Sequence, residues 1–179
     1  MCSRCFALWF ALGERSRADP KSRDIGLAIR EDGRKRGLRG YDAGKKTKGR
    51  KRQIIVDSLG LIHVLVVEPA DVQDRTGGKT ALSKLAESPR LKLVLADDGY
   101  SGQPMKDLAR SLGFEIEFVA SLKGSGFTLQ KRRWIVERTF AWLLKFRRLR
   151  TDYDLLCEST ASWIYAAMIR LMLRRLVTT

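Results

Sequence analysis

Apolar residues along the middle of the chain follow patterns that predict β-strands. Ile54–Val56 and Leu61–Val67 flank the turn residues 57–60, which is typical of a β-hairpin closed by glycine. Leu91–Ala96 is a nearly continuous apolar run, as in a buried strand, and Phe114–Val119 alternates between polar and apolar residues. These segments predict a sheet that begins with a hairpin and continues with two further strands.

Between and after these strands, apolar residues recur at helical spacing. The spacing predicts helices at about 76–87, 104–112, 133–150 and 159–176. A hairpin followed by alternating helices and strands, and then by long helices, predicts an α/β fold in which helices flank a mixed sheet.

The N-terminal segment, residues 1–36, lacks a sustained pattern. Phe6–Leu12 is apolar over a stretch too short to span a bilayer, and the brief alternation of Ile25, Leu27 and Ile29 predicts at most a short strand. The three cysteines form neither a zinc-binding set nor a disulfide framework. These features favour a cytoplasmic protein with no membrane partner.

Positive charge is concentrated in two segments. The chain has 35 Lys and Arg against 20 Asp and Glu, a net charge of +15. Residues 34–52 hold ten cations and one acid, and residues 131–150 hold eight cations and one acid, so the remainder is close to neutral. A basic run can simply solvate a surface, but two runs that contain nearly all the net charge favour a nucleic acid as partner.

Two carboxylates are placed where metal-dependent phosphodiester chemistry would need them. Asp97 directly follows the buried strand, and a turn at Gly99 keeps it at the edge of the sheet. Glu137 is the one acid of the second basic segment. Together they offer hard oxygen ligands for Mg²⁺. The alternative interpretations are a turn cap for Asp97 and a surface ion pair with Arg133 or Arg138 for Glu137.

The residues around Glu137 suit a DNA backbone. Arg132, Arg133 and Arg138 could hold phosphates, and Trp134 could stack on a flipped or frayed base or pack in the core. DNA contacts are also predicted for the cations of the first basic segment, which are Lys45, Lys46, Lys48, Arg50, Lys51 and Arg52.

Several motifs, in one order, resemble bacterial insertion-sequence transposases. The similarity is to the DDE type of the "insertion sequence five" group and covers about residues 37–176. The motifs are Gly40–Lys46, Lys48–Arg52, Val56–Gly60, Ala96–Tyr100, Arg132–Leu143 and Ile164–Arg175.

The resemblance implies a ribonuclease-H-like fold in which two Asp and one Glu hold two divalent ions, Mg²⁺ or Mn²⁺. These ions would activate water, and then a DNA 3′-hydroxyl, for strand cleavage and strand transfer in transposition. Asp97 matches the second Asp and Glu137 the Glu, with Arg133 and Arg138 beside them as phosphate contacts. DNA is the implied partner, and a homodimer on the DNA ends is the implied option for assembly.

The family's first Asp is not reproduced here. In the family it lies in a central strand, and the nearest acids by position, Asp24 and Asp32, lack the expected neighbours. Asp57 matches a different, structural position in the hairpin. Residues 1–36 are therefore expected to be unrelated or frameshifted and poorly ordered, joined to a catalytic-domain fragment at residues 37–179. The expected sheet is incomplete at its N-terminal strand, which leaves an unpaired edge.

Three functions are compatible with the sequence. The first is a transposase fragment that binds DNA and carries two of three metal ligands. The second is a catalytically inactive DNA-binding remnant. The third is a metal-dependent nuclease that uses Asp97, Glu137 and a substitute acid such as Asp24 or Asp32. Metal dependence separates the second from the others, because phosphate binding by Lys and Arg needs no ion and weakens with salt.

Overall fold

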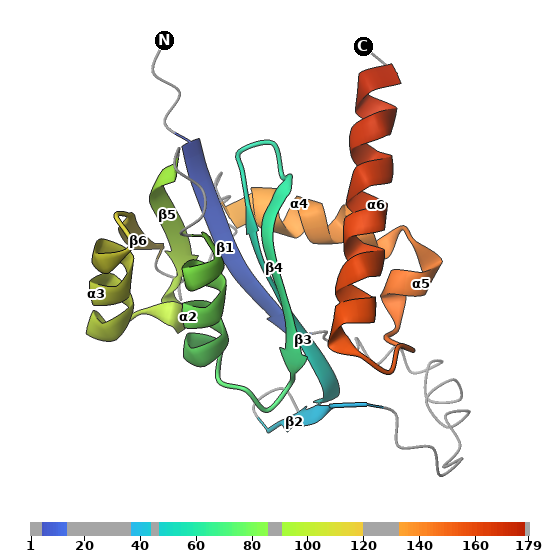
Figure 1. Ribbon diagram of the computed structural model, residues 1–179, viewed down its shortest axis with the longest axis horizontal. Helices are drawn as coiled ribbons and strands as arrows, with labels where there is room; N and C mark the ends of the chain where they lie inside the picture. The colour runs from blue at the N-terminus through green and yellow to red at the C-terminus, as the bar shows by residue number, and fades with distance from the viewer. Residues whose placement is uncertain (1–4, 14–36, 44–46, 86–90, 120–132, 178–179) are drawn as a thin grey trace, which may run out of the picture.

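The computed structural model describes residues 5–13, 37–43, 47–85, 91–119 and 133–177. A mixed sheet with helices on both faces forms the body of the molecule (Figure 1). The strands are β1 (Cys5–Gly13), β2 (Gly40–Asp42), β3 (Thr47–Val56), β4 (Ile62–Pro69), β5 (Leu91–Asp97) and β6 (Glu115–Val119). The helices are α2 (Asp74–Leu85), the short 3₁₀ helix η1 (Asp98–Tyr100), α3 (Gln103–Ser111), α4 (Arg133–Leu144), α5 (Arg147–Arg150) and α6 (Cys157–Val177).

The strands pair in a fixed order across the sheet. β4 pairs with β3 and β3 with β1, both antiparallel, and β1, β5 and β6 then continue as parallel neighbours. β2 pairs with the first residues of β3. The sheet therefore has its parallel strand ends, including the end of β5, along one edge.

The centre of the sheet differs from the sequence-based prediction. Where a missing strand was expected, Cys5–Gly13 lies between β3 and β5 and pairs with both. A strand covered on both faces carries an apolar run rather than an alternating pattern, and residues 6–12 form such a run. The short strand predicted at residues 25–29 lies outside the described residues.

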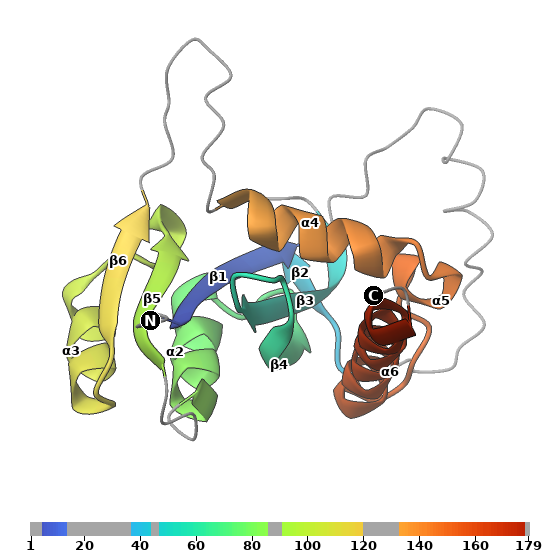
Figure 2. The same ribbon diagram turned by 90° about the horizontal axis from the view of Figure 1, so that it is seen from above.

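The two faces of the sheet have separate cores. Ile55, Val64, Val94 and Ala96 belong to one buried cluster, which also contains residues of α2 and α3. The opposite cluster is formed by Ile54, Val56, Leu65 and Leu95 with residues of α4 and α6. Figure 2 shows α4 across the sheet from α2 and α3. The alternation along β3, β4 and β5 thus assigns each strand residue to one of the two helical layers.

The hairpin between β3 and β4 confirms the sequence-based prediction. Asp57 Oδ1 accepts hydrogen bonds from the backbone N–H groups of Leu59 at 2.9 Å and Leu61 at 2.8 Å. Gly60 has a φ of 80°, which suits glycine. Asp57 therefore has the structural role expected for it.

The helix predicted at 133–150 is divided in two. α4 ends at Leu144 and α5 begins at Arg147, because Phe146 has an extended backbone with φ −83° and ψ 114°. None of the helices in the described ranges combines the length and apolar character needed to cross a membrane.

A polar pair within the sheet, in which Gln53 is buried and Glu68 is half-buried, predicts pH-dependent stability. Gln53 Nε2 donates to Glu68 Oε1. Burial raises the pKa of the Glu68 carboxyl, although Gln53 and Lys51 oppose this shift. The folded chain therefore holds the proton more tightly than the unfolded chain, and the free energy of unfolding should fall as pH rises from the ordinary carboxyl range through the raised pKa.

Glu68→Gln should remove this dependence. In urea titrations at pH 4 and pH 7, we expect the variant to gain stability relative to the original chain at the higher pH. An equal difference at both pH values would contradict the assignment to Glu68.

Candidate active site

Asp97 lies at the C-terminal end of β5, where the sequence placed it. Its Oδ1 accepts a hydrogen bond from the Asp98 backbone N–H at 2.9 Å and caps η1. The buried Tyr100 anchors this turn, whereas Asp98 and Gly99 are exposed. Asp97 itself is half-buried. The structure thus combines the two interpretations of Asp97, as a turn cap and as an acid at a strand end.

Glu137 is exposed on α4, beside the helix face that packs on the sheet. Its neighbours Val136 and Phe140 are buried in the cluster that also holds Leu95. Glu137 is therefore on a helix that is fixed to the sheet by its apolar residues, with its carboxylate at the surface.

Asp97 and α4 belong to the same face of the sheet. Leu93 and Leu95 pack in or against the cluster that contains α4 residues, while Val94 and Ala96 face the other core. Because successive strand residues alternate between faces, Asp97 follows Leu93 and Leu95. The structure therefore brings the end of β5 and the helix of Glu137 to one side of the sheet.

The neighbouring position on β1 carries no acid. Trp9 is opposite Ala96 in the parallel pairing, so position 10 lies beside Asp97. Phe10 is also opposite Ile54, which belongs to the core under α4. Position 10 is thus on the face of Asp97 and α4, but residues 5–13 include no Asp or Glu.

The acids of the described residues do not fit a two-ion centre. Asp97 and Glu137 are two carboxylates, and no three Asp, Glu, His or Cys side chains in the described ranges gather where they could hold a metal ion. Asp24 and Asp32, the substitutes considered from the sequence, lie outside those ranges. With two carboxylates, most coordination positions of a pair of hard divalent ions would have no protein oxygen as ligand.

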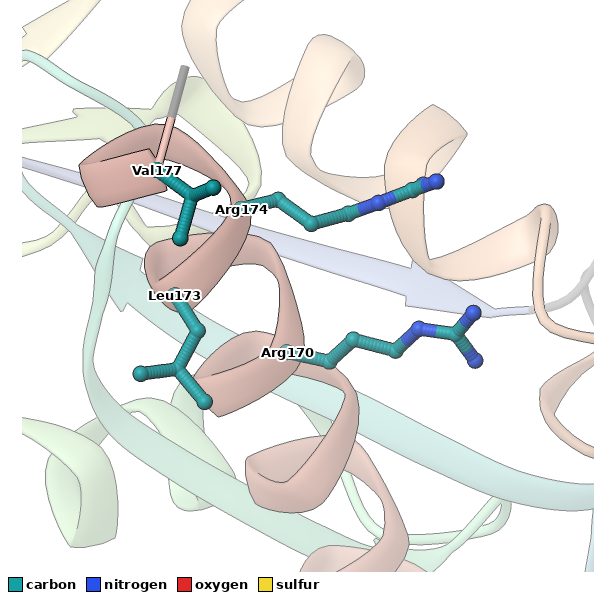
Figure 3. Close-up of a pocket in the computed structure, with 4 residues that line it drawn as sticks. All are labelled: Arg170, Leu173, Arg174 and Val177. Atoms are coloured by element: carbon teal, nitrogen blue, oxygen red, sulfur yellow. The ribbon is translucent and has the colours of Figure 1, made fainter. Parts of the chain in front are cut away.

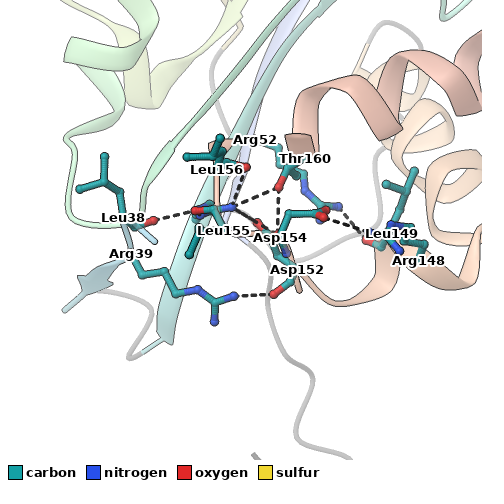
Figure 4. Close-up of polar contacts among 11 residues, drawn as sticks. Leu38, Arg39, Arg52, Arg148, Leu149, Asp152, Asp154, Leu155, Leu156 and Thr160 are labelled. Atoms are coloured by element: carbon teal, nitrogen blue, oxygen red, sulfur yellow. Dashed lines mark hydrogen bonds and ion pairs between the residues drawn. The ribbon is translucent and has the colours of Figure 1, made fainter. Parts of the chain in front are cut away.

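Arg50 is buried in internal contacts, unlike the surface position expected for a DNA contact. Its Nη1 lies 3.2 Å from Asp152 Oδ2, and its Nη2 donates to the Leu155 carbonyl at 2.6 Å. Further bonds reach the Leu38 carbonyl at 2.9 Å and Thr160 Oγ1 at 3.2 Å (Figure 4). Arg50 therefore joins β3 to the connection before α6 and is not presented to a phosphate backbone.

Lys51 and Arg52 are also buried. Lys51 Nζ lies 3.0 Å from Asp74 Oδ1 and 3.3 Å from Asp42 Oδ2, and it donates to the Val72 carbonyl at 2.9 Å. Burial lowers the pKa of Lys51, but the two carboxylates outweigh it and the net shift is upward. Arg52 Nη1 donates to the Leu149 carbonyl at 2.8 Å. The structure thus places all three cations of positions 50–52 in internal contacts with carbonyls and carboxylates, whereas the sequence predicted DNA contacts at the surface.

The remaining predicted DNA contacts are distributed over two elements. Lys48 is exposed near the start of β3, and Trp134 is 48% exposed in the first turn of α4. Arg133 begins α4. Arg138 lies over two tryptophan rings of the same helix, a contact that sequence reasoning missed. The other three, Lys45, Lys46 and Arg132, lie outside the described residues.

The amino-acid sequence matches the family model described as "Transposase DDE domain" over residues 17–172. The match begins inside the segment expected to be unrelated. A Burkholderia cepacia protein named "Putative transposase for insertion sequence element IS402" is 32% identical over 114 residues, which cover 59% of this chain and 54% of that protein. This chain therefore spans about half the length of the curated relative it matches.

Solved structures with a similar fold include retroviral proteins. The catalytic core domain of BIV integrase matches with a TM-score of 0.52 and 12% identity, over 92% of this chain and 80% of that one. A chain of the simian T-cell lymphotropic virus intasome, determined with PP2A regulatory subunit B56 gamma, matches with a TM-score of 0.51 and 13% identity, over 92% and 47%. These likenesses confirm the ribonuclease-H-like fold class. With the sequence match over most of its length, this chain belongs to the transposase DDE domain family.

Proposed function

We propose that this chain is the DNA-binding, catalytic-domain portion of an insertion-sequence transposase. The observation that carries the proposal is the placement of Asp97 and α4, with Glu137, on one face of a ribonuclease-H-like sheet in a member of the DDE family. In a complete site of this family, divalent ions such as Mg²⁺ or Mn²⁺ would supply the charge stabilisation for strand cleavage and transfer in DNA transposition. Asp97 and Glu137 would be two of their ligands.

A specific observation favours a second function for the chain as it stands. Position 10, beside Asp97 on the same face, is Phe rather than an acid. If the two carboxylates of the described residues are the whole ligand set, the chain would bind DNA without completing the transposition chemistry. It would then act as a catalytically inactive DNA-binding remnant, and binding as a homodimer on DNA ends would remain compatible with this role.

The proposed DNA surface is drawn from the DNA contacts predicted from the sequence. Lys48 and Trp134, which are exposed, belong to it together with Arg133, the first residue of α4, and Lys45, Lys46 and Arg132 are included from the sequence alone. It omits positions 50–52, whose cations are buried. Binding by Lys and Arg releases counterions from DNA, so affinity should fall steeply with salt and should not require a divalent ion.

Salt-dependent binding tests this surface. We expect fluorescence anisotropy with labelled duplex DNA to give the same affinity in EDTA and in Mg²⁺. Lys48→Gln should lower the slope of log K against log salt by about one. Arg110→Gln is the matched control, because Arg110 is exposed on α3, a helix that packs on the other face of the sheet. Binding that requires Mg²⁺, or an equal loss in the control, would contradict the proposal.

A further inference from the structure

Three side chains of α4 and one of α6 form a continuous stack. The guanidinium carbon of Arg138 lies 4.7 Å from the ring centre of Trp134 and 4.8 Å from that of Trp142. Residues four apart share one side of a helix, so this spacing lets Arg138 lie between the two rings. Arg175 of α6 follows, with its guanidinium carbon 4.6 Å from the Trp142 ring. The order is therefore Trp134, Arg138, Trp142 and Arg175.

The inner end of the stack is fixed to the turn between β3 and β4. A Cβ atom at Gly60 would lie 3.0 Å from the Trp142 ring, so the turn approaches the indole closely. Thr139 Oγ1, which is buried, donates to the Gly60 carbonyl at 2.9 Å. Arg175 Nη1 also lies 3.5 Å from the Leu59 carbonyl oxygen. Trp142 and Arg175 thus lie against the β3–β4 turn, while Trp134 at the outer end is exposed.

The Arg138 side chain is held by stacking on two rings. Its guanidinium lies over an indole on each side, and its Nε is buried with no hydrogen-bond partner in the part of the chain that the structure describes. A phosphate contact would instead use the N–H edge of the guanidinium. The sequence pattern of bases around Glu137 predicted a phosphate contact for Arg138, and stacking on two indoles is the contact that the described residues provide.

Other arginines of this region have the same kind of partner. Arg148 lies 4.2 Å from the Trp163 ring centre, and Arg170 lies 5.9 Å from that of Phe146. In Figure 3, Arg170 and Arg174 extend to the same side of α6, where a surface groove of about 350 Å³ lies. Several cations of the C-terminal helices therefore pack α4, α5 and α6 together.

We propose that Arg138 is a positioning residue that holds the exposed ring of Trp134 as a stacking surface for an unpaired DNA base. The proposal rests on the proposed DNA-binding function and narrows its substrate to DNA ends with unpaired bases. An indole stacks on any base, and a ring fixed before binding loses less conformational freedom when the base arrives. Trp134 lies one turn from Glu137, so the base would lie near this acid.

The planar guanidinium is what this role requires. It can stack on an indole with each of its faces, whereas the ammonium of lysine is a compact point charge on a flexible stem. Arg138→Lys therefore keeps the charge and removes the double stack. Arg147→Lys is the matched control, because Arg147 is exposed on the neighbouring α5.

The test compares DNA binding to a blunt duplex and to the same duplex with an unpaired end, over a series of salt concentrations. The original chain should prefer the unpaired end by at least about fivefold, the lower range for one stacked base. Arg138→Lys and Trp134→Ala should each abolish this preference, and the double variant should lose no more than either alone. The salt slope of Arg138→Lys should be unchanged, and Arg147→Lys should behave like the original chain.

Two results would overturn the proposal. In the first, the Arg138→Lys variant still prefers the unpaired end, and Arg138→Gln lowers the salt slope by about one. Arg138 would then be a phosphate contact. In the second, the original chain binds DNA in a salt-dependent way but shows no preference for unpaired ends. An original chain with no salt-dependent binding would overturn the proposed function as well, so the two failures are distinguishable. Trp134→Ala provides the test if Arg138→Lys does not fold.

Discussion

Arg50→Ala is expected to lower the free energy of unfolding by about 3–5 kcal/mol, the usual effect of removing one partner of a buried ion pair. Arg50 is buried, and its side chain binds Asp152, Thr160 and several backbone carbonyls. Alanine would leave the Asp152 carboxylate without this cation. It would also leave the carbonyls of Leu38 and Leu155 without this donor.

Two controls separate this effect from the loss of any arginine. Arg110→Ala, at an exposed ion pair on α3, should cost less than about 1 kcal/mol. Replacing both Arg50 and Asp152 with apolar residues of similar size should cost less than the sum of the single changes, because neither charge is left alone. Urea unfolding followed by circular dichroism measures all of these differences. A loss at Arg50→Ala as small as that at Arg110→Ala would show that the internal network contributes little.

Phe10→Asp is expected to create metal-dependent nuclease activity in this chain. Position 10 lies beside Asp97 on the face covered by α4, so an acid there would add a third carboxylate to Asp97 and Glu137. We expect nicking of supercoiled plasmid in Mn²⁺, and a reduction of more than about 100-fold when Asp97→Ala is added. Removing a direct metal ligand should reduce activity by more than the 10–100-fold loss that follows removal of a residue that only supports a ligand.

Two further substitutions on β1 distinguish the effect of the acid's position from the effect of its charge. Phe10→Asn removes the aromatic ring without supplying a charged oxygen ligand and should not nick DNA. Ala11→Asp places the acid one residue further, on the opposite face of the sheet, and should not nick either. Nicking by Ala11→Asp at the level of Phe10→Asp would show that the register of β1 does not determine the activity.

The sequence predicted the elements whose contacts are local. The β3–β4 hairpin follows from two apolar runs and a turn of four residues, and the end of β5 follows from a strand that meets Asp97 and Gly99. Each of these signals is contained in a few consecutive residues, so a single sequence is enough to detect it.

The parts that the sequence did not predict depend on distant partners. β1 pairs with β5, whose residues lie more than eighty positions later, so nothing near residues 6–12 indicated that this apolar run is a strand of the sheet. Arg50 was expected at the surface because its partner Asp152 is 102 residues away. The spacing of Trp134, Arg138 and Trp142 could have indicated the stack, but nothing local pointed to Arg175 on α6.

Calorimetric titration of Mn²⁺ into the original chain, beside Asp97→Ala, tests the central claim most directly. The claim is that Asp97 and Glu137 form an incomplete set of metal ligands in a chain that still binds DNA. It predicts no saturable Mn²⁺ binding that depends on Asp97, with salt-sensitive DNA binding unchanged by EDTA. Saturable binding that disappears in Asp97→Ala would contradict it, and would mean that another acid of the chain, such as Asp24 or Asp32, completes the site.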